Sequence, residues 1–368
     1  MLILLILCGA LSFITCALLL RFARSNGRRY SQSVPQRFHA GHVPRLGGVA
    51  MLVACTGGWA WIVGAQRFLA IQNQVHLPLS MALAWWAVAM IAGAGGVAED
   101  LTHRLTASWR LLFTVVAGAV ATWLLGLDIP SLGIASVQHV WSATPWPALV
   151  LAVFAIAGLP HAFNLIDGYN GLAGIVAIIC SFAIAYVALL NGDRQLAGMV
   201  IVLAGSTAGF LMWNYPRGLI FAGDGGAYLW GVVIAMAAIQ LVQRYPAVSP
   251  WFPVLLLIYP VWETLFSIWR KVMRGQSPGV ADALHFHQLI YRRIVRDVFD
   301  DDDARRMLLR NSRTSPYLWG FTILTVIPAV LFWGNTPVLV FFTALFVVSY
   351  VWVYVSIVRF KVPRWLRR

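Results

Sequence analysis

The sequence has 368 residues, of which 60% are hydrophobic and only 11% are charged, and its formal net charge at pH 7 is +14. Soluble domains carry about 25% charged residues, so this composition excludes an ordinary soluble protein. Apolar stretches of about 20 residues, the length that an α-helix needs to cross a bilayer, recur along the chain. We therefore predict an all-α, polytopic integral membrane protein.

The first apolar segment covers residues 2–20 and has no basic leader and no clear small-residue cleavage site. We interpret it as a retained span and not as a cleaved signal peptide. Hydropathy predicts ten more spans, which makes about eleven in all. They cover residues 46–66, 79–98, 108–126, 146–163, 171–190, 196–213, 226–243, 251–269, 317–334 and 338–358.

Lysine and arginine are distributed unequally between the connections. If the amino terminus lies outside and the carboxyl terminus lies in the cytoplasm, 24 of the 27 basic residues are cytoplasmic, as the positive-inside rule requires. Topology therefore explains the positive charge without a nucleic-acid partner. No internal repeat or low-complexity linker is present, so we predict one membrane domain over residues 1–368. Its cytoplasmic loops are 21–45, 99–110, 161–172, 213–225 and 270–316.

Acidic residues gather at the predicted cytoplasmic ends of the spans. An acid at a membrane boundary is costly unless it is paired, hydrated or bound to metal. Because four connections bring carboxylates, histidines and glycines to one face, we predict an assembled site open to the cytosol. The motifs are GVAEDL (Glu99, Asp100), NLIDGYNGL (Asp167), FAGDGG (Asp224) and ADALHFH (Asp282).

The first two motifs also have a structural interpretation. Glu99 and Asp100 could cap the following segment, in which Arg104 and Arg110 offer partners. The Asp-Gly and Asn-Gly steps of the second motif favour turns, which polar residues often fill without a function.

In the third motif, glycines let the backbone approach a ligand closely, and the single carboxylate can hold a divalent cation. His285 and His287 lack the further Cys or His ligands that a zinc site needs, so donors to phosphate oxygens fit them better.

Several other polar residues have a structural interpretation. The acidic run 300–303 precedes a basic segment and is typical of a solvated helix start. The four cysteines lie in apolar segments without a C-x-x-C pair, as expected of small apolar side chains. Glu263 is the one acid inside a predicted span and could face Arg270 or another helix.

In this order the motifs EDL, NLIDGYNGLAG, IFAGDGG and SPGVADALHFHQL resemble those of the polyprenyl-phosphate N-acetylhexosamine-1-phosphate transferases. The stretch PQRFHAGHVPRLGGVAM, which contains His39, is similar to the family's entry into its second span. The resemblance covers about residues 35–290. It implies a membrane enzyme that transfers an aminosugar-1-phosphate from a UDP-sugar to undecaprenyl phosphate and releases UMP. The branch that begins O-antigen and related polymers is more similar than the muramoyl-pentapeptide branch.

The resemblance also implies a role for individual residues. The family's acidic pair corresponds to Glu99 and Asp100, with Glu in place of the first Asp, and Gln288 replaces the last histidine of the family's fourth motif. The implied catalytic residues are Glu99, Asp100, Asp167 and Asp224, and the implied metal ligands are Asp224 and Asn164. The implied substrate-binding residues are Asn170, Asn214, Phe221, His285, His287 and His39. The basic residues Arg270, Lys271 and Arg274 can also hold phosphate oxygens as charge develops.

Hard oxygen ligands predict Mg²⁺, or Mn²⁺, as the cofactor. The expected partners are a UDP-N-acetylhexosamine, undecaprenyl phosphate and membrane lipid, and the family's enzymes are often homodimers. We expect a location in the bacterial inner membrane with the active site on the cytoplasmic face. A secondary transporter and a non-catalytic relative are the alternatives from other classes. A transporter would place its acids near the midplane of broken helices.

Overall fold

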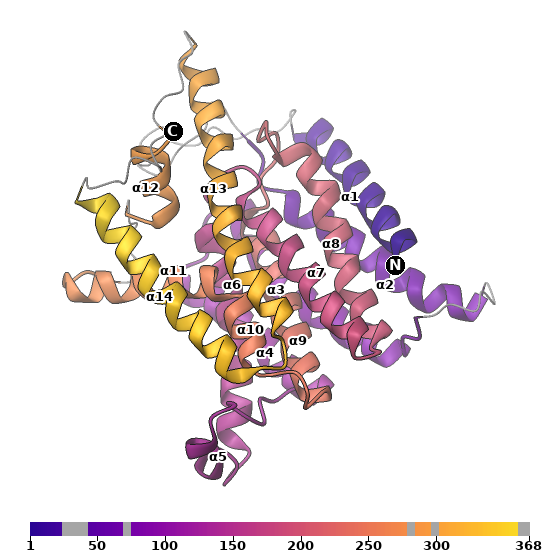
Figure 1. Cartoon of the computed structure of the whole chain (residues 1–368). Coiled ribbons are helices and arrows are strands. Elements are labelled where there is room, and N and C mark those ends of the chain that lie inside the picture. The colour runs from indigo at the N-terminus through magenta and orange to yellow at the C-terminus, as the bar shows by residue number, and fades with distance from the viewer. Residues whose placement is uncertain (24–42, 69–74, 278–283, 296–301, 360–368) are drawn as a thin grey trace.

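The computed structural model describes residues 1–23, 43–68, 75–277, 284–295 and 302–359. Every regular element in these ranges is an α-helix, as predicted (Figure 1). The helices are α1 (Leu2–Ala23), α2 (Gly47–Phe68), α3 (Leu79–Thr102), α4 (Ala107–Leu125), α5 (Ala135–Trp141), α6 (Trp146–Ile166), α7 (Leu172–Leu190), α8 (Arg194–Asn214), α9 (Gly223–Arg244), α10 (Trp251–Leu256), α11 (Ile258–Met273), α12 (Phe286–Arg293), α13 (Asp303–Leu331) and α14 (Thr336–Val358).

Within the described ranges, ten helices are long and apolar enough to cross a membrane. They correspond to ten of the eleven predicted spans, and their limits mostly agree with the prediction within a few residues. The largest difference concerns α13, which begins well inside the predicted 270–316 loop. Asp302 caps this helix, because its Oδ1 accepts a hydrogen bond from Ala304 N at 2.8 Å. The interpretation of the acidic run as a helix start is therefore confirmed at Asp302.

The predicted span over residues 251–269 is not continuous. The chain forms α10 and α11 with a break at Leu257. Pro260 has no N–H to donate to the carbonyl of Leu256, and its ring is incompatible with a regular helix at that carbonyl. The sequence contains the signal for this break, which hydropathy alone does not reveal.

Helix α11 is amphipathic in the inverse sense to a helix on the surface of a soluble protein. Its buried face carries Glu263, Ser267, Arg270 and Lys271. Its exposed face carries Leu265, Ile268, Trp269, Val272 and Met273. An apolar outer face is stable only in contact with lipid or another apolar surface, so the polar face of α11 is turned toward the rest of the protein.

Helix α9 lies at the centre of the bundle, and its residues 224–241 are all buried. In Figure 1, α1, α2 and α8 lie on one side of it, and α13 and α14 on the other. Small residues allow close packing against it: a Cβ added to Gly96 of α3 would lie only 2.4 Å from the backbone nitrogen of Gly225. This approach brings the carboxyl-terminal end of α3 to the amino terminus of α9.

Candidate active site

Asp224 is the centre of a polar cluster in which α4, α6 and α9 meet. Its Oδ2 accepts a hydrogen bond from Arg110 Nη1 at 2.9 Å and one from the Tyr228 hydroxyl at 3.3 Å. Its Oδ1 accepts a hydrogen bond from Asn164 Nδ2 at 2.9 Å. The carboxylate is buried, and Arg110 is partly exposed at the edge of the cluster. The third sequence motif is thus joined directly to the second.

Asp100 holds the amino terminus of α9 in place. Its two carboxylate oxygens accept hydrogen bonds from the backbone N–H of Asp224 at 3.0 Å and of Gly225 at 2.9 Å. Gly223 makes this arrangement feasible, because its φ is +70° and a Cβ there would lie 2.3 Å from Asp100 Oδ2. Asp100 therefore acts as a capping carboxylate supplied by another helix, and it fixes the backbone from which Asp224 extends.

Glu99 makes a different contact. Its Oε2 accepts a hydrogen bond from Leu105 N at 2.8 Å, which holds the turn between α3 and α4. The two neighbouring acids of the first motif thus point to different partners. Both have a structural contact beside their expected catalytic role, and that role stays a prediction.

Asp167 follows the last residue of α6, where the second motif turns away from the helix. Burial raises the pKa of its carboxyl group to about 7, and the charge of Asp224 contributes to this rise while Arg45 opposes it. A carboxyl group that is about half ionised at neutral pH is suited to accept a proton from a substrate and return it.

The two asparagines that were expected to bind substrate are engaged within the protein. Asn170 donates to the carbonyl of Pro216 at 3.0 Å, and its backbone N–H donates to Asn311 of α13 at 2.8 Å. Asn214 accepts from Gly171 N at 2.6 Å and donates to the carbonyl of Ile220 at 2.8 Å. These bonds fix the second motif against the 215–222 loop, and this loop leads into Asp224.

The two histidines of the fourth motif stack on each other, with ring centroids 5.4 Å apart and planes at 6°. Burial lowers the pKa of His287 to about 3, and the neighbouring His285 adds to this effect. His287 is therefore neutral at pH 7 and offers phosphate no positive charge. Its ring lies beside the second motif, since a Cβ added to Gly168 would be 2.9 Å from His287 Nε2.

The three basic residues at the carboxyl-terminal end of α11 differ in their exposure to solvent. Arg270 is buried and donates to the hydroxyl of Tyr354 on α14 at 2.9 Å. Lys271 is also buried, whereas Arg274, just after the helix, is exposed. The expected phosphate-binding set thus includes one arginine whose guanidinium already contacts α14.

The structure describes some, but not all, of the remaining residues that the sequence analysis singles out. Phe221 lies in the loop two residues before α9, where its backbone N–H donates to the carbonyl of Pro44 at 2.9 Å. His39 and Asp282 lie outside the described residues. The four cysteines are buried and free, as their interpretation as small apolar side chains requires.

Within the described ranges, no group of three or more His, Cys, Asp or Glu side chains is arranged to hold a metal ion. This does not conflict with Mg²⁺, which proteins commonly bind through one or two carboxylates while the phosphates of the substrate and water supply the other ligands. Asp224 offers such a carboxylate, and its present partners are side chains that can exchange. Asp167, whose pKa responds to the charge of Asp224, is a second carboxylate nearby.

Arg110 and Tyr228 were not among the expected site residues, although both contact Asp224. Arg110 had been considered only as a partner of Glu99 and Asp100. A sequence signal for its role does exist, because it is the one basic residue in the first turns of α4, on the predicted cytoplasmic side. Tyr228 lies four residues after Asp224, on the same face of a helix.

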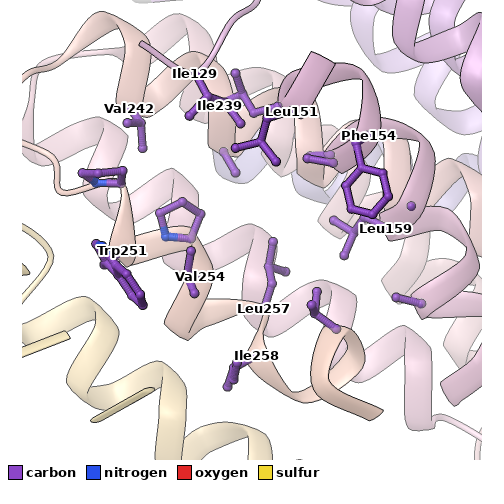
Figure 2. A pocket seen from close by; sticks show the side chains of 18 of the residues that line it. Ile129, Leu151, Phe154, Leu159, Ile239, Val242, Trp251, Val254, Leu257 and Ile258 are labelled. Atoms are coloured by element: carbon purple, nitrogen blue, oxygen red, sulfur yellow. The ribbon is translucent and has the colours of Figure 1, made fainter. Parts of the chain in front are cut away.

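An apolar pocket of about 690 Å³ lies between α6, α9, α10 and α11. Figure 2 shows its apolar side chains, such as Phe154, Leu151 and Leu257, turned toward a common space. His161 lines the same pocket. It shares a hydrogen bond of 3.0 Å with Thr114, and its ring packs edge-on against Tyr228. Because Tyr228 contacts Asp224, the pocket wall and the polar cluster are neighbours.

Residues 82–242 match the family described as Glycosyl transferase family 4. This region contains the first three motifs, together with the helices that support them.

Three curated proteins illustrate the similarity. A probable undecaprenyl-phosphate N-acetylglucosaminyl 1-phosphate transferase of Bacillus subtilis is 27% identical over 68% of this chain and 66% of its own length. An undecaprenyl-phosphate alpha-N-acetylglucosaminyl 1-phosphate transferase of Thermotoga maritima is 28% identical over 54% of this chain and 58% of its own. A protein of the same name from Escherichia coli is 25% identical, over 76% and 74%. The chain thus spans slightly less than two thirds of the first protein and 58% of the second.

Proposed function

We propose that this protein belongs to the polyprenyl-phosphate N-acetylhexosamine-1-phosphate transferase family, and that it transfers an N-acetylated aminosugar-1-phosphate from a UDP-sugar to undecaprenyl phosphate and releases UMP. The observation that carries the proposal is the contact of Asp224 with Arg110 and Asn164 at the amino terminus of α9. It joins separate motifs into one charged cluster, next to the apolar pocket between α6, α9, α10 and α11.

Both substrates are anionic phosphates, so their approach requires positive charge. Arg110 supplies a guanidinium at the edge of the cluster, and its planar set of donors suits phosphate oxygens. Asp224, with Asn164, would hold Mg²⁺, which when bound neutralises pyrophosphate charge and stabilises the leaving UMP. The protein's own contribution is mainly position and electrostatics, as in other phosphoryl transfers.

Asp167 is suited to accept a proton from the acceptor. A phosphate monoester has a second pKa near 6, so a small fraction of the lipid phosphate is still protonated at neutral pH. A carboxyl group with a pKa of about 7 can remove that proton. Asp100 contributes by fixing the backbone of Asp224.

The apolar pocket supports a polyprenyl acceptor. Its lining is almost wholly aliphatic and aromatic, which suits an isoprenoid chain and not a sugar. With the chain in this pocket, the phosphate end lies toward His161 and the Asp224 cluster. The cytoplasmic location of the site is supported by the concentration of lysine and arginine in the connections on that side.

The direct test combines the purified protein with UDP-N-acetylglucosamine, undecaprenyl phosphate and Mg²⁺. N-acetylglucosamine is the first sugar to test because the names of the similar proteins contain it. We expect UMP and a lipid-linked sugar phosphate, each dependent on both substrates. If a panel of UDP-aminosugars yields no UMP, the proposal is wrong. Uptake of a UDP-sugar into proteoliposomes without UMP would support a transporter.

The role of the pocket has a separate test with a matched control. Gly158 lines the pocket, and nothing lies within 4 Å of a Cβ placed on it. Gly158→Phe should therefore fill space and raise the KM for undecaprenyl phosphate, with little change in the KM for the UDP-sugar. Gly320 of α13 has the same open surroundings and does not line the pocket. Gly320→Phe should leave both constants unchanged.

We further propose that the product begins a bacterial surface polysaccharide such as O-antigen, with the enzyme in the inner membrane. Deleting the gene in its own host should then remove one surface polymer, and the wild-type gene should restore it. If all surface polymers persist in the deletion strain, this biological role is wrong while the reaction itself can still be correct.

A further inference from the structure

Glu263 of α11 is a fully buried acid that the proposed reaction does not use. Its side chain does not face Arg270, as the sequence suggested it could. It turns instead toward α12 and α14, where three groups lie within hydrogen-bond distance of its carboxylate. Oε1 accepts from the backbone N–H of Phe286 at 3.0 Å and lies 3.3 Å from Nδ1 of His285. Oε2 accepts from the Tyr350 hydroxyl at 2.6 Å.

These contacts determine the state of His285. An ionised carboxylate can only accept hydrogen bonds, so the Nδ1 that faces Glu263 must carry the proton. Nε2 is then the ring nitrogen left to act on another group. A carboxylate that fixes the tautomer and direction of an imidazole in this way is a common arrangement beside reacting groups.

The rings of His285 and His287 connect Glu263 to the site. The two rings stack almost in parallel, and His287 lies against Gly168, next to Asp167. Tyr169 packs edge-on against His287 from the same turn. A rotation of His285 would therefore disturb the stack and, through it, the turn that carries Asp167.

We propose that Glu263 is a positioning residue that holds His285 in the Nδ1-protonated form and directs its unprotonated Nε2 toward a protonated oxygen of the acceptor's phosphate, from which Nε2 accepts a hydrogen bond. The functional part of this inference rests on the proposed transferase activity. The tautomer part does not, because it concerns the protein alone. A purely structural alternative is that Glu263 only anchors the start of α12 through Phe286.

The tautomer can be measured without any activity. Nitrogen NMR of histidine-labelled protein in nanodiscs, with His285 assigned by its loss in His285→Asn, distinguishes the two ring nitrogens. We expect protonated Nδ1 in the wild type and a mixture of tautomers in Glu263→Met, which has a similar length and neither acceptor oxygen. The same tautomer in both proteins would overturn the proposal, whether or not the protein transfers sugar phosphate.

Kinetics test the functional part. We expect Glu263→Gln to reduce kcat by about 100-fold, the lower end of what a positioned acid–base side chain contributes, with little change in the KM for the UDP-sugar. Glu263→Asp keeps the charge and should recover part of the loss. If Glu263→Gln fails to fold, Glu263→Asp carries the test, since its kcat must then fall while its KM does not.

Asn335→Ala is the matched control. Asn335 caps the same helix as Tyr350, because its Oδ1 accepts a hydrogen bond from Val338 N at 3.3 Å, and it does not contact Glu263. We expect Asn335→Ala to lower the thermal midpoint and leave kcat near that of the wild type. If kcat in both variants falls in proportion to the thermal midpoint, Glu263 is only an anchor. A wild type that releases no UMP refutes the transferase activity, and the NMR result still stands.

Discussion

Helix α9 has an aspartate–arginine pair at each of its ends. At its amino terminus, Asp224 pairs with Arg110 of α4 at 2.9 Å. At its carboxyl terminus, Arg244 pairs with Asp193, the residue before α8, at 2.7 Å. The two pairs have similar lengths and similar exposure of the arginine, at 29% and 28%. Distance and burial therefore do not distinguish a candidate catalytic acid from a structural one.

The origin of the donors does distinguish them. Asp193 accepts from Leu196 N at 2.8 Å and so caps its own helix, which is a local structural role. The donors of Asp224 are all side chains, and two of them come from other helices. Side-chain partners can rotate away when a cation or a phosphate arrives, whereas a backbone N–H cannot. An acid held by exchangeable donors is thus available for chemistry.

The most decisive test of this difference between Asp224 and Asp193 is to neutralise each acid in turn. Asp224→Asn should reduce UMP release by about 100-fold or more, because it removes a charge that acts on the reacting phosphates, and should lower the thermal midpoint only by the loss of its ion pair. Asp193→Asn should lower the thermal midpoint by a similar amount, because asparagine still caps α8 and only the ion pair, worth about 0.2–1 kcal/mol, is lost, and it should keep near-normal turnover. Coupled turnover assays and thermal melts in detergent measure both. A stable, fully active Asp224→Asn would refute the assignment.

The next prediction concerns the support of Asp224. Asn in place of Asp100 can accept one of the two backbone N–H groups but presents an NH₂ to the other, which leaves a buried donor unsatisfied at a cost of about 1–3 kcal/mol. We expect Asp100→Asn to lower both the thermal midpoint and the turnover, the latter about tenfold, as Asp224 moves out of place.

Gly223→Ala tests the same contact from the other side. A Cβ at this residue would collide with the Asp100 carboxylate, and the φ of +70° disfavours alanine. The two substitutions act on one contact, so the double variant should cost less than the sum of the two. If the losses of stability in the two single variants add fully in the double variant, the two substitutions do not act through one contact between Asp100 and Gly223.

The next prediction concerns how the stability of the protein depends on pH through the buried His287. His287 has a pKa of about 3 in the folded protein, against 6.5 for the unperturbed side chain. Between these values the unfolded chain binds more protons than the folded one, so stability rises with pH through this window and is lost as the pH falls below about 6.5. Thermal midpoints should decrease from pH 7 to pH 4.5, and His287→Asn should reduce this slope.

His103 provides the control for that measurement. It is exposed, and its φ of +53° is one that asparagine also tolerates. His103→Asn should therefore leave the slope as in the wild type. If the slope of His287→Asn equals that of the wild type, burial of the neutral His287 ring does not limit stability in acid.

The sequence was sufficient to predict where the long apolar helices lie and that the motifs meet. Hydropathy predicts all ten helices of the described ranges that are long and apolar enough to cross a membrane, because span length and composition are local properties. Direct contacts join the second and third motifs at Asn164 and Asp224, and the first and third at Asp100 and the α9 backbone.

The contacts that each site residue makes within the protein could not be predicted in this way. That Asp100 caps a helix 124 residues later depends on the close approach of α3 and α9, which no local pattern encodes. Likewise, the internal bonds of Asn170 and Asn214 depend on how α13 and the 215–222 loop pack. The break before α11 is the exception: Pro260 is a local signal for it, and hydropathy averages over that signal.

The smallest expected effect concerns Glu99, the acid of the first motif that contacts a turn. Glu99→Asp keeps the charge but is one methylene shorter, so it should lose the 2.8 Å bond from Leu105 N at a cost of about 1 kcal/mol. Glu99→Gln keeps an oxygen at that distance and loses the charge. If Glu99 acts through charge, Glu99→Asp should retain transfer within about tenfold of the wild type, and Glu99→Gln should be weaker. The reverse order of the two turnover rates would place Glu99 with Asp193, among the acids that hold the fold and not among those that act on substrate.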